Sequence, residues 1–107
     1  MVWIDNLYVS DNINKKKNKI IKKIKKGKLT ANKYIIALSR SDSDLLDIFQ
    51  ANVLKQSYYK SQDIIVIGVA SGKKKSYELV KKIFDDCIEF TGTLDIKQFI
   101  KSRMGEQ

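Results

Sequence analysis

Residues 63–84 read DIIVIGVASGKKKSYELVKKIF, and this stretch contains the pattern that decides the fold. Residues 64–70 are apolar except for Gly68, which predicts a strand that is buried on both faces. After the turn at Ser71 and Gly72, apolar residues recur at helical spacing from Leu79 to Ile88. A strand covered on both faces is typical of the centre of a sheet that is flanked by helices.

The rest of the chain supplies the other elements of the predicted fold. We expect a short strand at 7–9, a helix over 11–26 that ends at Gly27, a strand over 34–38, and helices over 45–54, 74–90 and 94–103. This order predicts an α/β domain with a three-stranded, mostly parallel sheet between two helical layers. The chain has 107 residues, no proline and no linker-like stretch, so we expect residues 1–107 to form a single domain.

The composition excludes several classes of chemistry. Cys87 is the single cysteine and histidine is absent, which excludes an internal disulfide and a Ser-His or Cys-His pair and argues strongly against a zinc site. Cys87 falls on the apolar stripe of a helix, so we expect it to be a buried core residue. No apolar run reaches the ~20 residues that span a bilayer, and the first residues do not resemble a signal peptide. We therefore expect a cytoplasmic protein without a cofactor.

Positive charge is concentrated in one segment. The chain has 19 lysines and 2 arginines, a bias that is typical of AT-rich genomes, but residues 11–34 contain ten of the lysines and one aspartate. The other 83 residues carry eleven basic and eleven acidic side chains. The resulting candidates for binding an anionic partner are Lys15, Lys16, Lys19, Lys22, Lys23 and Lys26. The alternative interpretation is the solvated face of a packed helix.

The type of basic residue indicates how such a surface would bind. Residues 11–33 contain no arginine and no aromatic residue. Contacts with phosphates require only lysines, whereas base reading and stacking usually require arginine or aromatic side chains. The pattern therefore favours contact with a phosphate backbone over sequence-specific reading.

Two loops, 39–44 and 70–76, follow predicted strands, where ligands of parallel sheets commonly bind. The second loop gives the phosphate-binding candidates Ser71, Gly72, Lys73 and Lys74 at a helix N-terminus. Three residues separate Gly68 from Gly72, whereas a P-loop has four, which argues against nucleotide hydrolysis. In the first loop, Asp42 and Asp44 are weak candidates for magnesium, and we favour the alternative that they cap the next helix.

Two stretches carry a resemblance to a known family. They are Trp3–Val9 with the lysine-rich segment behind it, and Asp44–Leu79, which includes Leu45-Leu46-Asp47-Ile48, Tyr58-Tyr59-Lys60 and the apolar run at 65–70. In these residues the chain resembles a family of small proteins from clostridial and other low-GC Firmicutes bacteria, for which no activity is assigned. The resemblance implies such an origin, in agreement with the lysine bias, and implies no site.

Three functional hypotheses follow from the sequence. The first is a small binding module, not an enzyme, whose lysine-rich helix contacts nucleic acid or an acidic protein surface. The second is a binder of, or enzyme for, a phosphate-bearing small molecule at loops 39–44 and 70–76. The third is an accessory protein that forms homo-oligomers through Trp3, Tyr58 and Tyr59.

Overall fold

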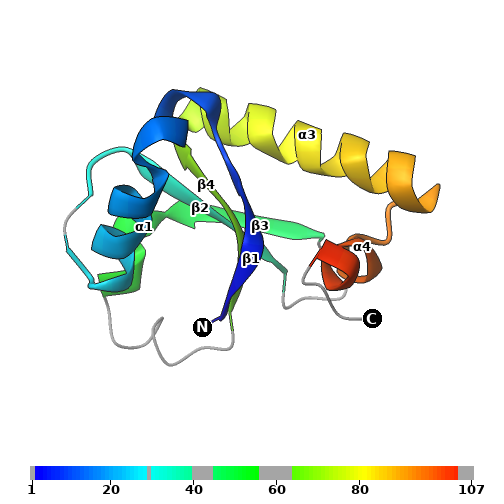
Figure 1. Ribbon diagram of the computed structural model, residues 1–107, viewed down its shortest axis with the longest axis horizontal. Coiled ribbons are helices and arrows are strands. Elements are labelled where there is room, and N and C mark those ends of the chain that lie inside the picture. Colours follow the sequence, from blue (N-terminus) through cyan, green and yellow to red (C-terminus); the bar gives the residue numbers. More distant parts are fainter. Residues whose placement is uncertain (1, 29, 40–44, 56–63, 104–107) are drawn as a thin grey trace.

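The computed structural model describes residues 2–28, 30–39, 45–55 and 64–103. Its elements run in the order β1 (Val2–Val9), the 3-10 helix η1 (Asp11–Lys16), α1 (Lys17–Lys25), β2 (Lys33–Leu38), β3 (Leu46–Gln50), the 3-10 helix η2 (Ala51–Lys55), β4 (Ile65–Ser71), α3 (Lys73–Thr91) and α4 (Ile96–Arg103). They form an α/β fold around a mixed four-stranded sheet with the strand order β1-β4-β2-β3 (Figure 1).

The predicted central strand is confirmed. β4 lies between β1, to which it is parallel, and β2, to which it is antiparallel. Val66 and Ile67 are completely buried and point to opposite faces, into two separate core clusters. An uninterrupted apolar run is therefore required here, because each face of β4 is covered by other elements.

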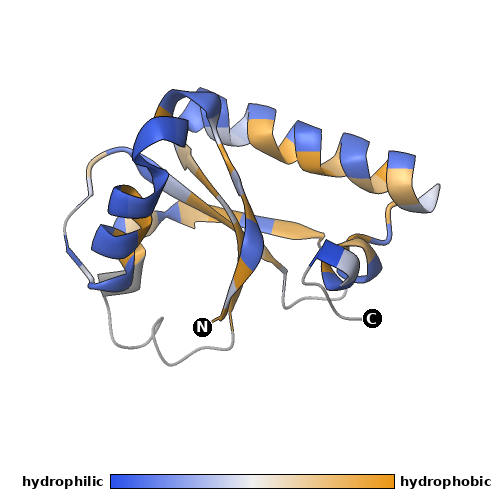
Figure 2. Cartoon of the chain, in the orientation of Figure 1, coloured by the Kyte–Doolittle hydropathy of each residue, from blue (hydrophilic) through white to orange (hydrophobic). Residues whose placement is uncertain are grey.

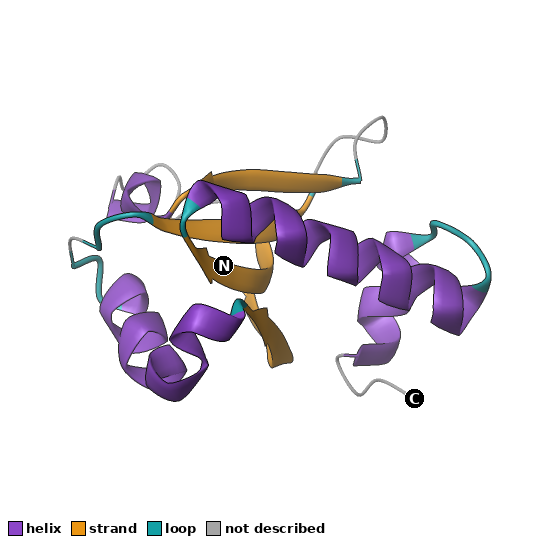
Figure 3. Cartoon of the chain, turned by 90° about the horizontal axis from the view of Figure 1, so that it is seen from above, coloured by secondary structure: helices purple, strands orange, loops and turns teal. Residues whose placement is uncertain are grey.

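The two faces of the sheet are covered by different helices. α3 and α4 pack on one face through Leu79, Ile83 and Phe99, and η1 and α1 pack on the other through Ile13 and Ile24. Figure 2 shows α1 and α3 each with an apolar side toward the sheet and a polar side away from it. Figure 3 shows α3 crossing above the strands. Cys87 belongs to α3 and is buried in the core on the side of the helix that faces the sheet, as predicted.

The prediction of a three-stranded, mostly parallel sheet is wrong both in the number of strands and in their direction. In the described part of the chain the sheet has four strands, and of its three pairs only β1–β4 is parallel. The segment 45–54, predicted as a helix, contains strand β3 and part of η2, and β3 pairs antiparallel with β2 from Leu38↔Leu46 to Tyr34↔Gln50. The apolar residues here follow helical spacing, but a strand that uses both faces satisfies the same pattern: Leu46 and Ile48 pack on one core cluster and Phe49 on the other. The first strand is also longer than predicted and occupies residues 2–9 instead of 7–9.

β1 follows β4 with an interruption that shapes this edge of the sheet. Trp3 is paired with Val66 and Tyr8 with Gly68, so β1 uses three more residues than β4 between the two pairs. Gly68 lies close to its neighbours at this point: a Cβ atom there would stand 3.3 Å from Leu79 Cδ2, so the leucine side chain would have to shift slightly, and 3.4 Å from the Tyr8 carbonyl oxygen, an ordinary contact. Within the described residues, no helix has the length and apolar composition needed to cross a membrane.

Candidate functional site

The six lysines that the sequence singles out lie together on η1 and α1. Lys15 and Lys16 end η1, whereas Lys19, Lys22 and Lys23 belong to α1 and Lys26 caps its C-terminus. All six side chains are exposed. The helix therefore presents them to solvent.

Four of these lysines share one face of α1. A helix turns by about 100° per residue, so the side chains of Lys19, Lys22, Lys23 and Lys26 fall within a sector of about 100°. The buried or half-buried isoleucines Ile20, Ile21 and Ile24 occupy the opposite sector, toward the sheet. We call the four lysines the basic face of α1.

The lysines of α3 stand in a different electrostatic setting. Lys75 Nζ lies 3.5 Å from Glu78, Lys81 Nζ lies 2.8 Å from Asp85, and Lys82 Nζ lies 3.6 Å from Asp86. Among the described residues, no ion pair joins a lysine of η1 or α1 to a carboxylate. Three of the five lysines of α3 are thus paired with carboxylates, whereas none of the four lysines of the basic face has such a pair in the described structure.

The two remaining lysines of α1 lie outside the basic face: Lys25 borders it, and Lys17 falls on the side of the isoleucines. Lys17 and Lys25 line a polar pocket of about 270 Å³ between α1 and β1, together with Trp3, Asn6 and Asn18. Lys25 Nζ lies 5.2 Å from the centroid of the Trp3 ring. Sequence reasoning missed this contact, because the two residues are far apart in the chain and only the packing of α1 beside β1 joins them.

The predicted phosphate site at 71–74 has two of its backbone donors already engaged. The Ser71 amide donates to Ser10 Oγ at 3.1 Å, and the Gly72 amide donates to the Asn32 carbonyl oxygen at 2.8 Å. Lys73 and Lys74 are exposed at the start of α3. The turn is therefore a junction between β4, η1 and β2, and Ser71 and Gly72 do not present free amides to an anion.

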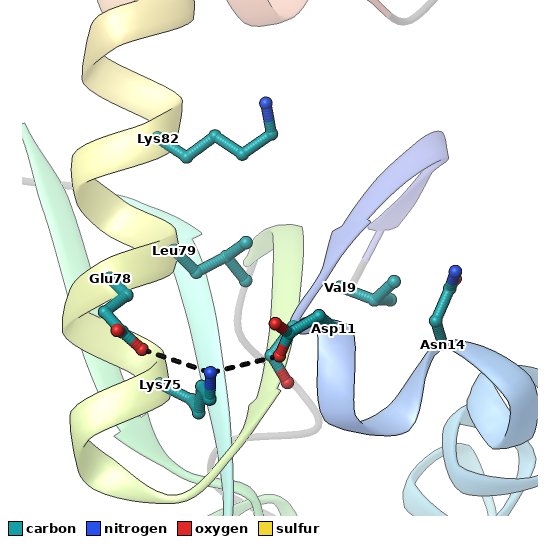
Figure 4. A pocket seen from close by; sticks show the side chains of 8 residues that line it. Val9, Asp11, Asn14, Lys75, Glu78, Leu79 and Lys82 are labelled. Atoms are coloured by element: carbon teal, nitrogen blue, oxygen red, sulfur yellow. Dashed lines mark ion pairs between the residues drawn. The ribbon is translucent and has the colours of Figure 1, made fainter.

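A pocket of about 420 Å³ lies close to this turn, between η1 and α3 (Figure 4). It opens at the carboxyl ends of the parallel strands β1 and β4, where the sequence analysis expects a ligand. Lys75 crosses the pocket, 3.2 Å from Asp11 and 3.5 Å from Glu78. The hydrogen bond and charge of Asp11, followed by the charge of Glu78, raise the pKa of Lys75. Lys75 is thus charged and already paired, which leaves Lys82 as the other cation of the lining.

The acidic candidates for a metal, Asp42 and Asp44, lie outside the described residues, as do Tyr58 and Tyr59 and most of loop 39–44. Asp47 is exposed on β3. Within the described ranges, no group of three or more histidine, cysteine, aspartate or glutamate residues is arranged to hold a metal ion.

Comparison of this chain with protein-family models, with curated proteins and with solved structures finds no match in any of the three. The family resemblance stated from the sequence therefore stays a prediction.

Proposed function

We propose that this protein is a binding module that attaches to the phosphodiester backbone of nucleic acid through the basic face of α1, without reading base sequence. The observation that carries the proposal is the grouping of Lys19, Lys22, Lys23 and Lys26 on one exposed sector of a packed helix. Within the described structure no carboxylate pairs with them, so their charge is available to an external anion.

The composition of this face favours nucleic acid over an acidic protein. Protein interfaces are depleted in lysine and enriched in arginine and aromatic residues. The basic face contains neither of these types. Contacts with phosphate oxygens require only positive charge at a suitable spacing, which flexible lysines provide.

The length of the face sets the expected number of contacts. From Lys19 to Lys26 the helix rises by about 10 Å, at about 1.5 Å per residue. One strand of duplex DNA rises about 3.4 Å per nucleotide, so the face matches roughly three phosphates. Each neutralised phosphate contributes about −0.9 to the slope of log K against log salt. We therefore expect a slope near −3.

The test is a salt titration of binding to a labelled DNA duplex, with two charge-matched triple variants. The first variant is Lys19→Glu/Lys22→Glu/Lys26→Glu, and the control is Lys73→Glu/Lys74→Glu/Lys101→Glu, which changes net charge equally. We expect the first to lose most of the affinity and nearly all of the salt slope, because each removed phosphate contact lowers the slope by about 1. We expect the control to keep the slope.

Three outcomes would contradict the proposal. A flat salt dependence of the unmodified protein would show that lysine–phosphate contacts do not drive binding. An equal loss in the control variant would place binding outside α1 or reduce it to net charge. Binding of polyglutamate as tight as that of the duplex at the same salt would assign the face to acidic proteins.

A further inference from the structure

The fold places an aromatic ring beside the lysines of α1. Trp3 lies on β1, paired with Val66, and its half-buried ring packs against the core cluster beneath α1. Lys25 reaches over the ring, with its Nζ 5.2 Å from the ring centroid. The ring is thus held on one side by the core and meets a cation at the pocket.

The pocket beside this ring is lined by the apolar residues Ile4, Leu7 and Ile21 and by several polar or charged side chains. Lys17 faces the same pocket from the first turn of α1, and the amides of Asn6 and Asn18 also line it. An aromatic ring with flanking cations is the combination with which proteins bind unpaired bases and their phosphates. The volume of about 270 Å³ is slightly below the range of drug-sized sites, which suits one base.

We infer that the nucleic acid bound by this protein is single-stranded, and that one of its bases stacks on Trp3 while Lys17 and Lys25 contact the adjoining phosphates. This inference rests on the proposed function, because the same strand continues along the basic face of α1. In a duplex both faces of every internal base are covered by neighbouring bases, so only an unpaired base reaches the ring.

The charges around the ring determine how a strand enters. A lysine over an exposed ring is weakly held, so a base displaces Lys25 from Trp3 and leaves its ammonium group to pair with a phosphate. Asp5 also lines the pocket, and among the lining residues it is the one that carries a negative charge. It repels phosphate from its end of the pocket and can accept a hydrogen bond from an N–H group of a base. The base is therefore directed toward β1 and the backbone toward α1.

Trp3 is the single tryptophan of the chain, so its fluorescence reports directly on this site. The experiment titrates the protein with oligo(dT), oligo(U), a DNA duplex of equal phosphate number and inorganic polyphosphate, with excitation selective for tryptophan. We expect both single strands to quench Trp3 as they bind, whereas duplex and polyphosphate bind through lysines with little quenching. Quenching by one of the two oligonucleotides alone would identify DNA or RNA as the strand.

Two substitutions of Trp3 supply the affinity test, with binding followed through a labelled oligonucleotide. Trp3→Leu removes the stacking surface and should weaken single-strand binding by roughly tenfold, within the range reported for one stacked base, with duplex binding unchanged. Trp3→Phe keeps a ring and should recover most of the affinity, and unchanged duplex binding by Trp3→Leu would show that its loss of single-strand binding is not caused by misfolding.

The failure of this inference is distinguishable from the failure of the proposed function. Three outcomes would overturn the stacking site and leave binding through α1 in place. They are single-strand binding without quenching, equal quenching by polyphosphate, and equal losses of duplex and single-strand affinity in Trp3→Leu. Absence of binding to any of the four polymers would overturn both.

Discussion

Tyr8 joins β1 to both helices on its side of the sheet. Its hydroxyl donates to Asp86 Oδ2 of α3 at 2.7 Å, and the guanidinium carbon of Arg103 of α4 lies 4.1 Å from its ring centroid. Arg103 Nη2 also donates to the Asn6 carbonyl oxygen at 2.6 Å, in the part of β1 that leaves the β4 register. Burial, together with the hydrogen bond to Asp86, raises the pKa of Tyr8 above its ordinary value.

Replacing Tyr8 with phenylalanine tests this hydrogen bond. A hydrogen bond to a charged acceptor contributes about 1.5 kcal/mol or more, and the partial exposure of Asp86 sets our expectation at about 1.5 kcal/mol. We expect Tyr8→Phe to lower the free energy of unfolding by this amount at neutral pH. The measurement is denaturant unfolding of both proteins.

The pH dependence of that difference has a definite sign. Because the pKa of Tyr8 is raised, the folded protein keeps the phenolic proton at a pH where the unfolded chain has lost it. The stability advantage over Tyr8→Phe is therefore constant from neutral pH to about pH 10, the ordinary tyrosine pKa, and declines as pH rises further. Lys82 lies near Asp86 and Arg103 lies near the ring of residue 8. Both cations are present in the two proteins, so the comparison isolates the Tyr8 hydroxyl. An advantage that grows above pH 10 would contradict the assignment.

Helix α1 carries the basic face although it is short and electrostatically strained. It has nine residues, fewer than the ~12 at which isolated helices become even marginally stable, and Lys22 and Lys26 repel each other at helical spacing. Its apolar side packs on the sheet, and its end is closed by two backbone bonds, Gly27 N to Ile24 O at 3.0 Å and Lys28 N to Lys23 O at 3.0 Å. The packing of α1 on the sheet and the hydrogen bonds at its C-terminal end therefore stabilise the helix that carries the lysines.

The end of α1 predicts the effect of substituting Gly27. This residue has φ of 72°, a left-handed conformation that costs other L-residues about 1–2 kcal/mol, with asparagine among the better tolerated. We expect Gly27→Ala to lower the free energy of unfolding by about 1 kcal/mol and Gly27→Asn, the matched control, to lower it less. Thermal or denaturant unfolding measures both. Equal stability of Gly27→Ala and the unmodified protein would contradict this account of the helix end.

Local patterns in the sequence predicted the parts of the fold that depend on neighbouring residues. The apolar run at 64–70 indicated a strand covered on both faces, and the glycines at 27 and 92 indicated the ends of α1 and α3, which the structure confirms. The β2–β3 hairpin was missed because Leu46, Ile48 and Phe49 suit a two-sided strand as well as a helix. The choice depends on pairing with β2, a contact that the segment's own spacing does not contain.

The candidate site also has a part that local sequence patterns predict and a part that depends on tertiary packing. The lysines of α1 could be found from the sequence, because a charged face needs only helical periodicity. The position of Trp3 beside Lys25 could not, because it arises from the packing of α1 against the edge strand β1. The ion pair of Asp11 with Lys75 likewise joins η1 to α3, two elements that are far apart in the sequence.

On the scale of the complete chain, the excess positive charge lies on one side of an otherwise balanced molecule. The formal net charge is +9, and residues 11–34 account for all of it. Such asymmetry orients the protein as it approaches a polyanion and raises the association rate at low salt. We propose that the surface formed by η1 and α1, and not the turn at 71–74, contacts the polyanion.

The most direct test maps the bound surface by amide and indole NMR shifts during titration with a short single-stranded oligonucleotide at low salt. The account predicts that the largest shifts fall on residues 15–28 and on the Trp3 indole, and that residues 71–76 change little. Shifts centred on residues 71–76 and the start of α3, with α1 unaffected, would contradict it.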